Sequence, residues 1–434
     1  MKTISEASRE IPLLYEADVV VVGGGPGGIG AALAAARNGA DTVLLENYGC
    51  LGGNQTLAFN DTFSFVDDRV QGGIVQELIN GLKDGDAIFD SPPGIIRDHW
   101  GSRDSGCFYF DGEYYKYMLE QKMYESGVRL FYHVFVTDAI VENGLIRGVI
   151  VETHEGRRAV LGKTVIDCTS VGHVAWKSGA RVTGEEGYAD DRYGPFKGMH
   201  MGLGYGMFVA NMDFQKFREF AEQNEEEWDS WVKGKKTFAR YKKEGKLKAA
   251  RGSCLMNEYA NGRCWILHPY YPLPKGEHPW MVESMTAGEI DMRRQAWETF
   301  NMFKESVPGF ENARLEQTPS RLLMRDSHRI VADRSVGVDD LYETKVFDDA
   351  VACCNMQVDV FFPTGSHHFK YENTPFDIPY SCMVSKDIPN LMAAGGSVDC
   401  DLISWSALRY CTPALCTGQA AGTAAAIAGK QGVT

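Results

Sequence analysis

The chain has 434 residues, enough for two or three domains, and 44% of them are hydrophobic, which is ample for large cores. Its formal net charge of −14 argues against nucleic acid and anionic membranes as partners, because contact with phosphates requires a basic surface. The sequence shows no signal peptide, no apolar run long enough to span a membrane and no C-x-x-C pair among its 11 cysteines. We therefore expect a cytoplasmic protein with reduced thiols and no bound metal.

The most informative segment, residues 17–53, reads as a strand, a glycine-rich turn, a helix and a second strand. The apolar run at residues 19–22 is typical of a parallel strand that is buried on both faces. Gly23, Gly25 and Gly28 then satisfy the pattern G-x-G-x-x-G. These glycines permit a tight turn, close approach of a pyrophosphate and close packing of the helix on the strand. This order predicts a binding site for the ADP half of a dinucleotide.

The helix after the turn is expected to end near Gly39 and to direct its N-terminal amides toward the phosphates. The second strand, residues 42–45, leads into Glu46, close to the spacing of about 20 residues expected for the acid that binds ribose hydroxyls. An acid here would repel a 2′-phosphate, so NADP is disfavoured. Gly52 and Gly53 suit a chain that passes close to the centre of the cofactor, and such a pair is commoner in FAD proteins than in NAD dehydrogenases.

The next part of the chain predicts helices at residues 73–82 and 114–126, followed by a three-stranded meander. The meander strands are expected at residues 129–141, 145–153 and 158–168. Asn143 and Gly144 form a strong hairpin signal between the first two of these strands. The third strand would return to the main sheet.

Residues 175–385 differ in composition from the preceding part of the chain and are expected to form a second domain that shapes the substrate cavity. Its predicted elements are a charged helical stretch at 213–248, aromatic strands at 264–271 and 280–286, and a long helix at 289–306. Residues 201–208 look like a second nucleotide loop, but Met207 stands where the third glycine belongs, so we interpret them as a strand. The chain would therefore hold one dinucleotide site.

From residue 390 the sequence is again small and apolar, which predicts a strand and an alanine-rich helix that rejoin the first domain. The predicted fold class is α/β. A discontinuous Rossmann-like FAD-binding domain, with a central parallel sheet and the three-stranded meander, would comprise residues 1–174 and 386–434. An α+β substrate or cap domain would comprise residues 175–385.

The chain resembles the FAD-dependent oxidoreductases related to the flavoprotein subunits of fumarate reductase and succinate dehydrogenase, within the glutathione-reductase-type flavin fold. The resemblance covers most of the chain apart from roughly 210–300 and implies FAD as the cofactor. It rests on the motifs ADVVVVGGGPGGIGAALAAARNGA, LLENYGCLGGNQT, FDGEYYKYMLEQKMYESGV, VIDCTSVGHVAWKSGA, MRDSHRI, FDIPYSCMV, IPNLMAAGG and LRYCTPALCTGQAAGTAAA.

The resemblance also implies a set of cofactor-binding residues. They are Gly23, Gly24, Gly25, Pro26, Gly27, Gly28, Glu46, Asn47, Gly52, Gly53, Asn54, Val136, Gly395, Gly396, Gly418 and Gln419. Within this set the backbone of Val136 would meet the adenine, and Gly395 and Gly396 would approach the ribityl chain. The helix that begins near Pro413 would point its N-terminus at the pyrimidine edge of the flavin, where a helix dipole stabilises negative charge. The chain departs from the family at Gly396, where an arginine is usual.

Candidate catalytic residues come from two kinds of side chain. His367 and His368 are candidates for moving a proton, because histidine titrates near neutral pH; the alternative is that both are surface residues. Arg325 and Arg329 lie in a motif shared with the family and could bind a carboxylate through the guanidinium fork; the alternative is a structural ion pair. Arg409, just before the flavin-facing helix, could take either role.

The leading hypothesis is an FAD-dependent oxidoreductase that transfers a hydride equivalent between a small organic substrate and flavin N5. The alternative is a flavin-binding electron-transfer subunit or scaffold that needs a partner protein for its chemistry. A third interpretation, an NAD-dependent dehydrogenase, predicts a colourless protein. The sequence specifies neither the electron donor or acceptor nor the oligomeric state, and it is compatible with a homo-oligomer.

Overall fold

The computed structural model describes residues 2–64, 66–67, 70–89, 108–189, 191–228, 232–259, 262–365, 367–370 and 375–433, with residues 192 and 367–370 described by their backbone alone. The fold is α/β and is built on a seven-stranded sheet in the order β6-β2-β1-β9-β8-β7, with β20 added beside β9. These strands are β1 (Leu13–Val22), β2 (Thr42–Leu45), β6 (Arg129–Phe131), β7 (Phe135–Glu142), β8 (Leu145–Thr153), β9 (Gly156–Asp167) and β20 (Leu391–Ala393).

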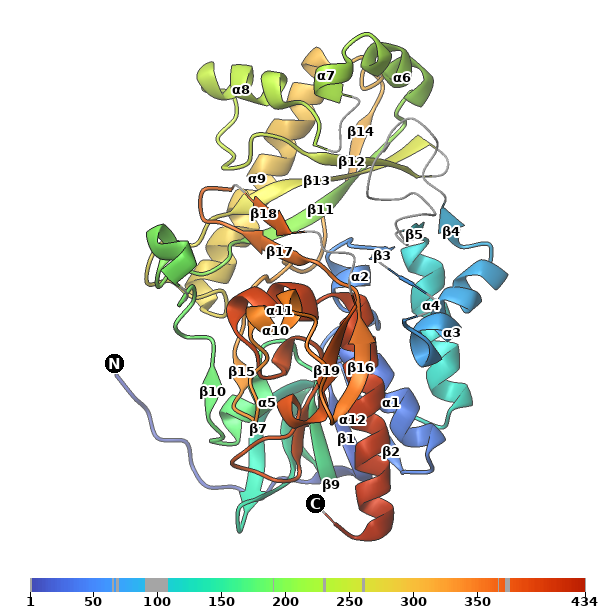
Figure 1. Ribbon diagram of the computed structural model, residues 1–434, viewed down its shortest axis with the longest axis vertical. Coiled ribbons are helices and arrows are strands. Elements are labelled where there is room, and N and C mark those ends of the chain that lie inside the picture. Colours follow the sequence, from blue (N-terminus) through green and yellow to red (C-terminus); the bar gives the residue numbers. More distant parts are fainter. Residues whose placement is uncertain are drawn as a thin grey trace.

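The parallel half of this sheet carries the predicted dinucleotide unit. Val20 of β1 pairs with Val43 of β2 on one side and with Val165 of β9 on the other, all in parallel register. The apolar run that ends β1 is buried on both faces because helices cover one side and the rest of the fold covers the other (Figure 1). β20 joins β9 in parallel, so the C-terminal part of the chain completes the sheet begun by the N-terminal part, as predicted.

The antiparallel half is the meander β7-β8-β9. Its first turn uses Asn143 and Gly144, both with positive φ, as a two-residue hairpin with the right-handed strand twist requires. The first predicted strand of the meander, residues 129–141, is in fact divided. β6 pairs with β2 in the parallel half, and His133, at φ +56°, turns the chain before β7 begins.

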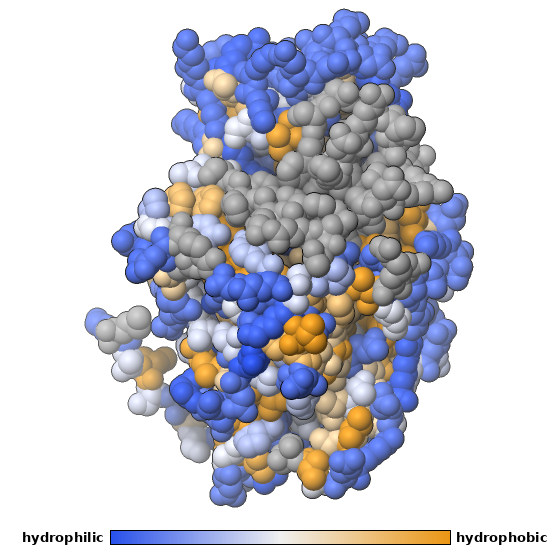
Figure 2. All heavy atoms as spheres, viewed as in Figure 1, coloured by the Kyte–Doolittle hydropathy of each residue, from blue (hydrophilic) through white to orange (hydrophobic). Residues whose placement is uncertain are grey.

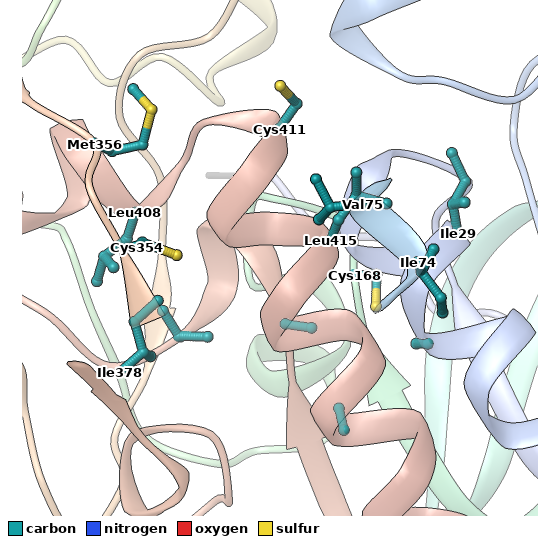
Figure 3. Close-up of a cluster of buried hydrophobic side chains, with 14 of the residues drawn as sticks. Ile29, Ile74, Val75, Cys168, Cys354, Met356, Ile378, Leu408, Cys411 and Leu415 are labelled. Atoms are coloured by element: carbon teal, nitrogen blue, oxygen red, sulfur yellow. The ribbon is translucent and has the colours of Figure 1, made fainter. Parts of the chain in front are cut away.

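Two glycine-rich helices pack face to face against the parallel half. They are α1 (Pro26–Arg37) and α12 (Cys411–Gln431). A Cβ on Gly418 would lie 2.1 Å from the carbonyl oxygen of Gly27, and a Cβ on Gly30 would lie 2.4 Å from that of Leu415. The two backbones can therefore approach this closely only without side chains at these positions. Figure 3 shows the N-terminal part of α12 in the core, with Leu415 lying between Val75 on one side and Leu408 on the other.

A second core lies above the first in Figure 1 and surrounds the sheet β12-β13-β11-β14. Its elements are β11 (Leu203–Ala210), α6 (Phe214–Glu222), α7 (Glu225–Trp228), α8 (Lys235–Lys243), β12 (Leu255–Tyr259), β13 (Arg263–Tyr271), α9 (Val282–Ser306) and β14 (Arg314–Gln317). The surface over α6, α7 and α8 is almost entirely hydrophilic (Figure 2), as the predicted charged helices require.

Two sequence predictions can be compared directly with this second core. The segment that imitates a nucleotide loop is strand β11, as interpreted from the sequence. The aromatic strand predicted at residues 280–286 is wrong, because these residues lead into α9. Ser284, Gly288 and Met292, spaced four residues apart, are buried on one face of the helix, and this packing overrides the local strand preference of Trp280 and Val282.

The remaining elements connect and cover the two cores. They are α2 (Asn54–Leu57), β3 (Thr62–Phe63), α3 (Gly73–Asp84), β4 (Ile88–Phe89), β5 (Phe108–Phe110), α4 (Gly112–Glu125), α5 (His173–Lys177), β10 (Val182–Thr183), η2 (Asp191–Phe196), β15 (Arg329–Ile330), α10 (Val338–Tyr342), β16 (Ala350–Cys354), β17 (Val358–Phe361), β18 (His367–Lys370), β19 (Phe376–Pro379), η4 (Tyr380–Cys382), η5 (Gly395–Ser397) and α11 (Leu402–Leu408). No helix in the described part of the chain is both long and apolar enough to cross a membrane.

The hydrophobic clusters bear on the proposed domain boundaries. The second core draws its buried residues from Leu203 to Leu322. Ile330, Val360 and Ile378 belong instead to the two clusters that flank the large sheet. The domain boundaries at residues 174 and 386 stay a proposal. This packing favours placing the second boundary close to residue 325 and not at residue 386.

Candidate functional site

The buried carboxylate of Glu46 ties the glycine turn to the end of β2. Its Oε2 accepts a hydrogen bond of 2.6 Å from the amide of Gly24, and its Oε1 accepts one of 2.8 Å from the amide of Tyr48. Burial raises the pKa of Glu46, against the effect of these backbone amides, which lower it. Gly52 donates its amide to the carbonyl of Gly24 at 2.9 Å, so the two glycine-rich segments are held together.

Three glycine segments meet at the N-terminus of α1. A Cβ on Gly25 would have as its nearest neighbour the Cα of Gly53, at 3.9 Å. A Cβ on Gly27 would lie 3.3 Å from the carbonyl carbon of Ala394 and 3.3 Å from the amide nitrogen of Gly395. Gly25 caps the helix without a side chain, which leaves first-turn amides of α1 for an anion such as a diphosphate.

A cavity of about 440 Å³ begins at this turn and extends over the end of β2. Glu46, Asn47 and Val136 line it, together with residues of α5 and of the segment before β15. The carbonyl of Val136 is 2.8 Å from Nε2 of His173, which holds the strand against α5. The cavity thus has an acid for ribose hydroxyls at one end and an apolar strand for a flat ring at the other.

A second cavity, of about 70 Å³, lies where the two cores meet. The described residues that line it are Asn60, Thr62, Tyr109, Val232, Arg251, Ser253, Cys254, Leu255, Trp265, Leu267, Leu323, Arg325, Asp359, Phe361, Arg409 and Tyr410. β12 and β13 contribute from the second core, and β17 and the start of α12 contribute from the first. We call this the arginine cavity, after Arg251, Arg325 and Arg409.

Hydrogen bonds organise one side of the arginine cavity around Asp359. Arg409 donates from Nη2 to Asp359 Oδ2 at 3.0 Å, and the hydroxyl of Tyr410 donates to the same oxygen. Burial, followed by the charge of Asp359, raises the pKa of Tyr410 far above its usual value, so the phenol stays protonated at neutral pH. Tyr410 is also the N-cap residue of α12, so this network is fixed to the start of that helix.

The glycine turn, the buried Glu46 and the larger cavity fit a dinucleotide. Helix α12, which begins beside the arginine cavity, packs on the same glycine turn. A family model described as FAD dependent oxidoreductase matches residues 18–434. The chain belongs to the FAD-dependent oxidoreductase family. FAD is therefore its cofactor, and the residues of the turn and of the larger cavity would hold the ADP half.

A solved structure with a TM-score above 0.5 has a similar fold. A p-nitrophenol 4-monooxygenase from Pseudomonas putida is 11% identical, with a TM-score of 0.51 over 97% of this chain and 82% of its own. A geranylgeranyl bacteriochlorophyll reductase-like protein from Thermoplasma acidophilum is 15% identical, with a TM-score of 0.48 over 96% of this chain and 78% of its own. No curated protein matches the chain.

The structure of this FAD-dependent oxidoreductase brings most predicted cofactor residues together at the N-terminus of α1. Two residues of the predicted set, Gln419 and Gly418, make contacts within the protein. Gln419 accepts a hydrogen bond of 2.8 Å from the amide of Ile74 at the start of α3, and Gly418 provides the close contact with Gly27. Gly396, where the family usually has arginine, accepts a hydrogen bond of 2.7 Å from the indole of Trp405. The assignment of individual residues to FAD stays a prediction.

Among the predicted catalytic residues, Arg325 and Arg409 lie in the arginine cavity. Arg329 does not; it is fully buried and pairs with Asp326 at 3.2 Å, which is the structural alternative. His367 and His368 lie in β18, where their backbones pair with Phe361 and Val360, and their side chains lie outside what the structure describes.

Three lining residues, Arg251, Asp359 and Tyr410, were missed by the sequence reasoning. Tyr410 stands inside a recognised family motif, LRYCTPALC, and could have been found there. Arg251 and Asp359 stand in segments without a motif, and only the fold brings them to the cavity. The described residues contain no group of three or more His, Cys, Asp or Glu side chains placed to hold a metal ion.

Proposed function

We propose that this enzyme transfers a hydride equivalent between a small organic substrate in the arginine cavity and N5 of FAD. One observation carries the proposal: α12 contacts both sites. Arg409 and Tyr410, directly before the helix, line the arginine cavity. About two turns further along α12, Thr417 accepts a hydrogen bond of 3.0 Å from the amide of Gly395, in the glycine cluster at the start of α1. A single rigid element thus connects substrate and cofactor.

Bound FAD supplies the two-electron chemistry, and the protein supplies position, charge and a proton. Asp359 holds the Tyr410 hydroxyl in one orientation, and Arg409 shares the same carboxylate oxygen. Leu255, Leu267 and Leu323 close the apolar side of the cavity, which limits access of water to a reacting carbon. The Tyr410–Asp359 pair is the group best placed to hold or move the proton that accompanies the hydride.

The test begins with the absorbance spectrum of the purified protein before and after denaturation. We expect flavin bands at one FAD per chain, which also shows whether the flavin is covalently attached. The photoreduced enzyme is then mixed, without oxygen, with panels of small organic molecules and with air. An enzyme of this kind reoxidises with one chemical class much faster than with the others.

Two results would contradict the proposal. A colourless protein that takes up no FAD on reconstitution would remove the cofactor. Reduced flavin that reoxidises only with a separate electron-carrier protein, and with no small molecule, would favour the electron-transfer subunit. Replacement of Tyr410 by Phe gives a matched control, since it keeps the ring and the N-cap backbone while removing the hydroxyl. We expect normal FAD content and slower turnover.

A further inference from the structure

We infer that the arginine cavity binds a small molecule that carries two negative charges, and this inference rests on the proposed function for its role as the substrate site. The described residues that line the cavity include three guanidinium groups, on Arg251, Arg325 and Arg409, and one carboxylate, on Asp359. Arg409 and Asp359 pair with each other at 3.0 Å. Two positive charges remain, which a dianion would neutralise.

Arg325 is the residue that points most clearly to an anionic ligand. Its side chain is 2% exposed and lines the cavity. Its Nε and Nη1 are buried and find no hydrogen-bond partner among the described residues. Buried guanidinium nitrogens are nearly always paired, because leaving a charged donor unsatisfied is costly. An anion between Arg325 and its neighbours would satisfy these donors.

Repulsion between the arginines supports the same conclusion. Burial, and then the charges of Arg409 and Arg251, lower the pKa of Arg325 to about 9. Burial also lowers the pKa of Arg251. Both shifts mean that the protein around the cavity disfavours the positive charge, and a bound anion would oppose that effect.

Ring contacts position the guanidiniums of Arg325 and Arg251. The Phe361 ring has Arg325 at 4.2 Å and Arg251 at 5.1 Å from its centroid, which are cation–π distances. Gly204 of β11 leaves room for the group, since a Cβ there would lie 2.3 Å from Nη1 of Arg325. The cationic site is thus preorganised, as expected for a binding site.

The size of the cavity limits the ligand. A volume of about 70 Å³ holds roughly five to seven water-sized groups. The apolar side chains of Leu255, Leu267 and Trp265 suit a short carbon skeleton beside the charged groups. The dianion could be supplied by two carboxylates on a short chain or by one phosphate group, and the experiment separates these sources.

The test is a binding titration of the FAD-loaded protein at constant ionic strength. Succinate represents two carboxylates, inorganic phosphate one phosphate group, propionate a monoanion and succinamide a neutral molecule. Binding is followed by the flavin absorbance difference and by tryptophan fluorescence, because Trp265 lines the cavity. We expect succinate or phosphate to bind at least tenfold more tightly than propionate, with no binding of succinamide.

Two variants locate the binding. Arg325→Gln and Arg251→Gln should each weaken the tighter dianion by about tenfold to a hundredfold, whereas Arg240→Gln, on an exposed part of α8, should leave it unchanged. FAD content and far-UV circular dichroism show whether each variant is folded. If Arg325→Gln does not fold, Arg251→Gln alone tests the location of binding. Equal affinity for propionate and both dianions, or dianion binding that survives in both folded variants, would overturn the inference. Fluorescence reports binding even if the proposed reaction is wrong, so the two failures are distinguishable.

Discussion

Arg325 carries a buried positive charge that the fold itself does not neutralise, so function and stability should conflict at this residue. Its pKa is about 9 in the folded protein and 12.5 when unperturbed. A base whose pKa is lower in the folded state reduces stability at all pH values below the folded pKa, and this cost fades as the pH rises above it.

We therefore predict that Arg325→Met stabilises the protein at pH 7 by about 1–4 kcal/mol while it weakens dianion binding by at least tenfold. Met keeps an unbranched apolar stem beside Phe361. The apparent urea midpoints of variant and parent, measured at pH 7 and pH 10, check this. The difference should be smaller at pH 10. A destabilised variant at pH 7 would mean that Arg325 is already neutralised in the free protein.

Asp61, between the cavity residues Asn60 and Thr62, should make stability depend on pH. Burial raises its pKa to about 7, against a neighbouring Tyr259 hydroxyl that lowers it. An acid with a raised folded pKa contributes stability that is full below its unfolded pKa of 3.8 and is lost as the pH rises through 7. Between pH 5 and pH 8 the free energy of unfolding of Asp61→Asn, measured by urea denaturation, should therefore rise relative to that of the parent by about 2–3 kcal/mol. Parallel pH profiles of the two proteins would contradict this.

At the scale of elements, the contact between α1 and α12 is the one most sensitive to a single methyl group. Gly418→Ala would put a Cβ 2.1 Å from the Gly27 carbonyl, on the turn that is predicted to bind the diphosphate. We expect a loss of about 1–3 kcal/mol of stability and weaker FAD retention, because the helices must separate. Gly429→Ala is the control: the same helix has open space there, so stability should stay equal or rise slightly. FAD retention is measured by gel filtration and absorbance, and equal retention in both variants would refute the prediction.

These elements also show what the sequence could and could not predict. β1, α1, β2 and the hairpin at Asn143 and Gly144 follow from local periodicity and turn chemistry, so they were predicted closely. The start of α9 was not, because Trp280 and Val282 favour a strand locally and only packing on β13 selects the helix. Arg251 and Asp359 meet in one cavity through tertiary contacts between segments about a hundred residues apart, and no local pattern carries that information.

At the scale of the whole molecule, two hydrophobic cores share one chain, and the two ligand sites relate to them differently. The glycine turn and Glu46 directly follow β1 and β2 of the large sheet. The arginine cavity takes Leu255 and Leu267 from the sheet of the second core and Phe361 from the first. A ligand stabilises only the folded units that it contacts, by RT ln(1 + [L]/Kd).

This difference predicts the calorimetric behaviour. Heating should give two transitions, and free FAD at 100 times its Kd should stabilise the one that contains the large sheet by about 2.7 kcal/mol, with a smaller effect on the other, which only the flavin ring would contact. Succinate or phosphate, whichever binds, should raise the midpoint temperatures of both transitions, because the arginine cavity is built from both cores. Glu46→Gln should weaken the FAD effect and leave the dianion effect intact, since Glu46 lies in the larger cavity alone. If FAD and the dianion shifted the same transition by the same pattern, the two cores would unfold as one unit, and residues 203–322 would not form a separate substrate domain.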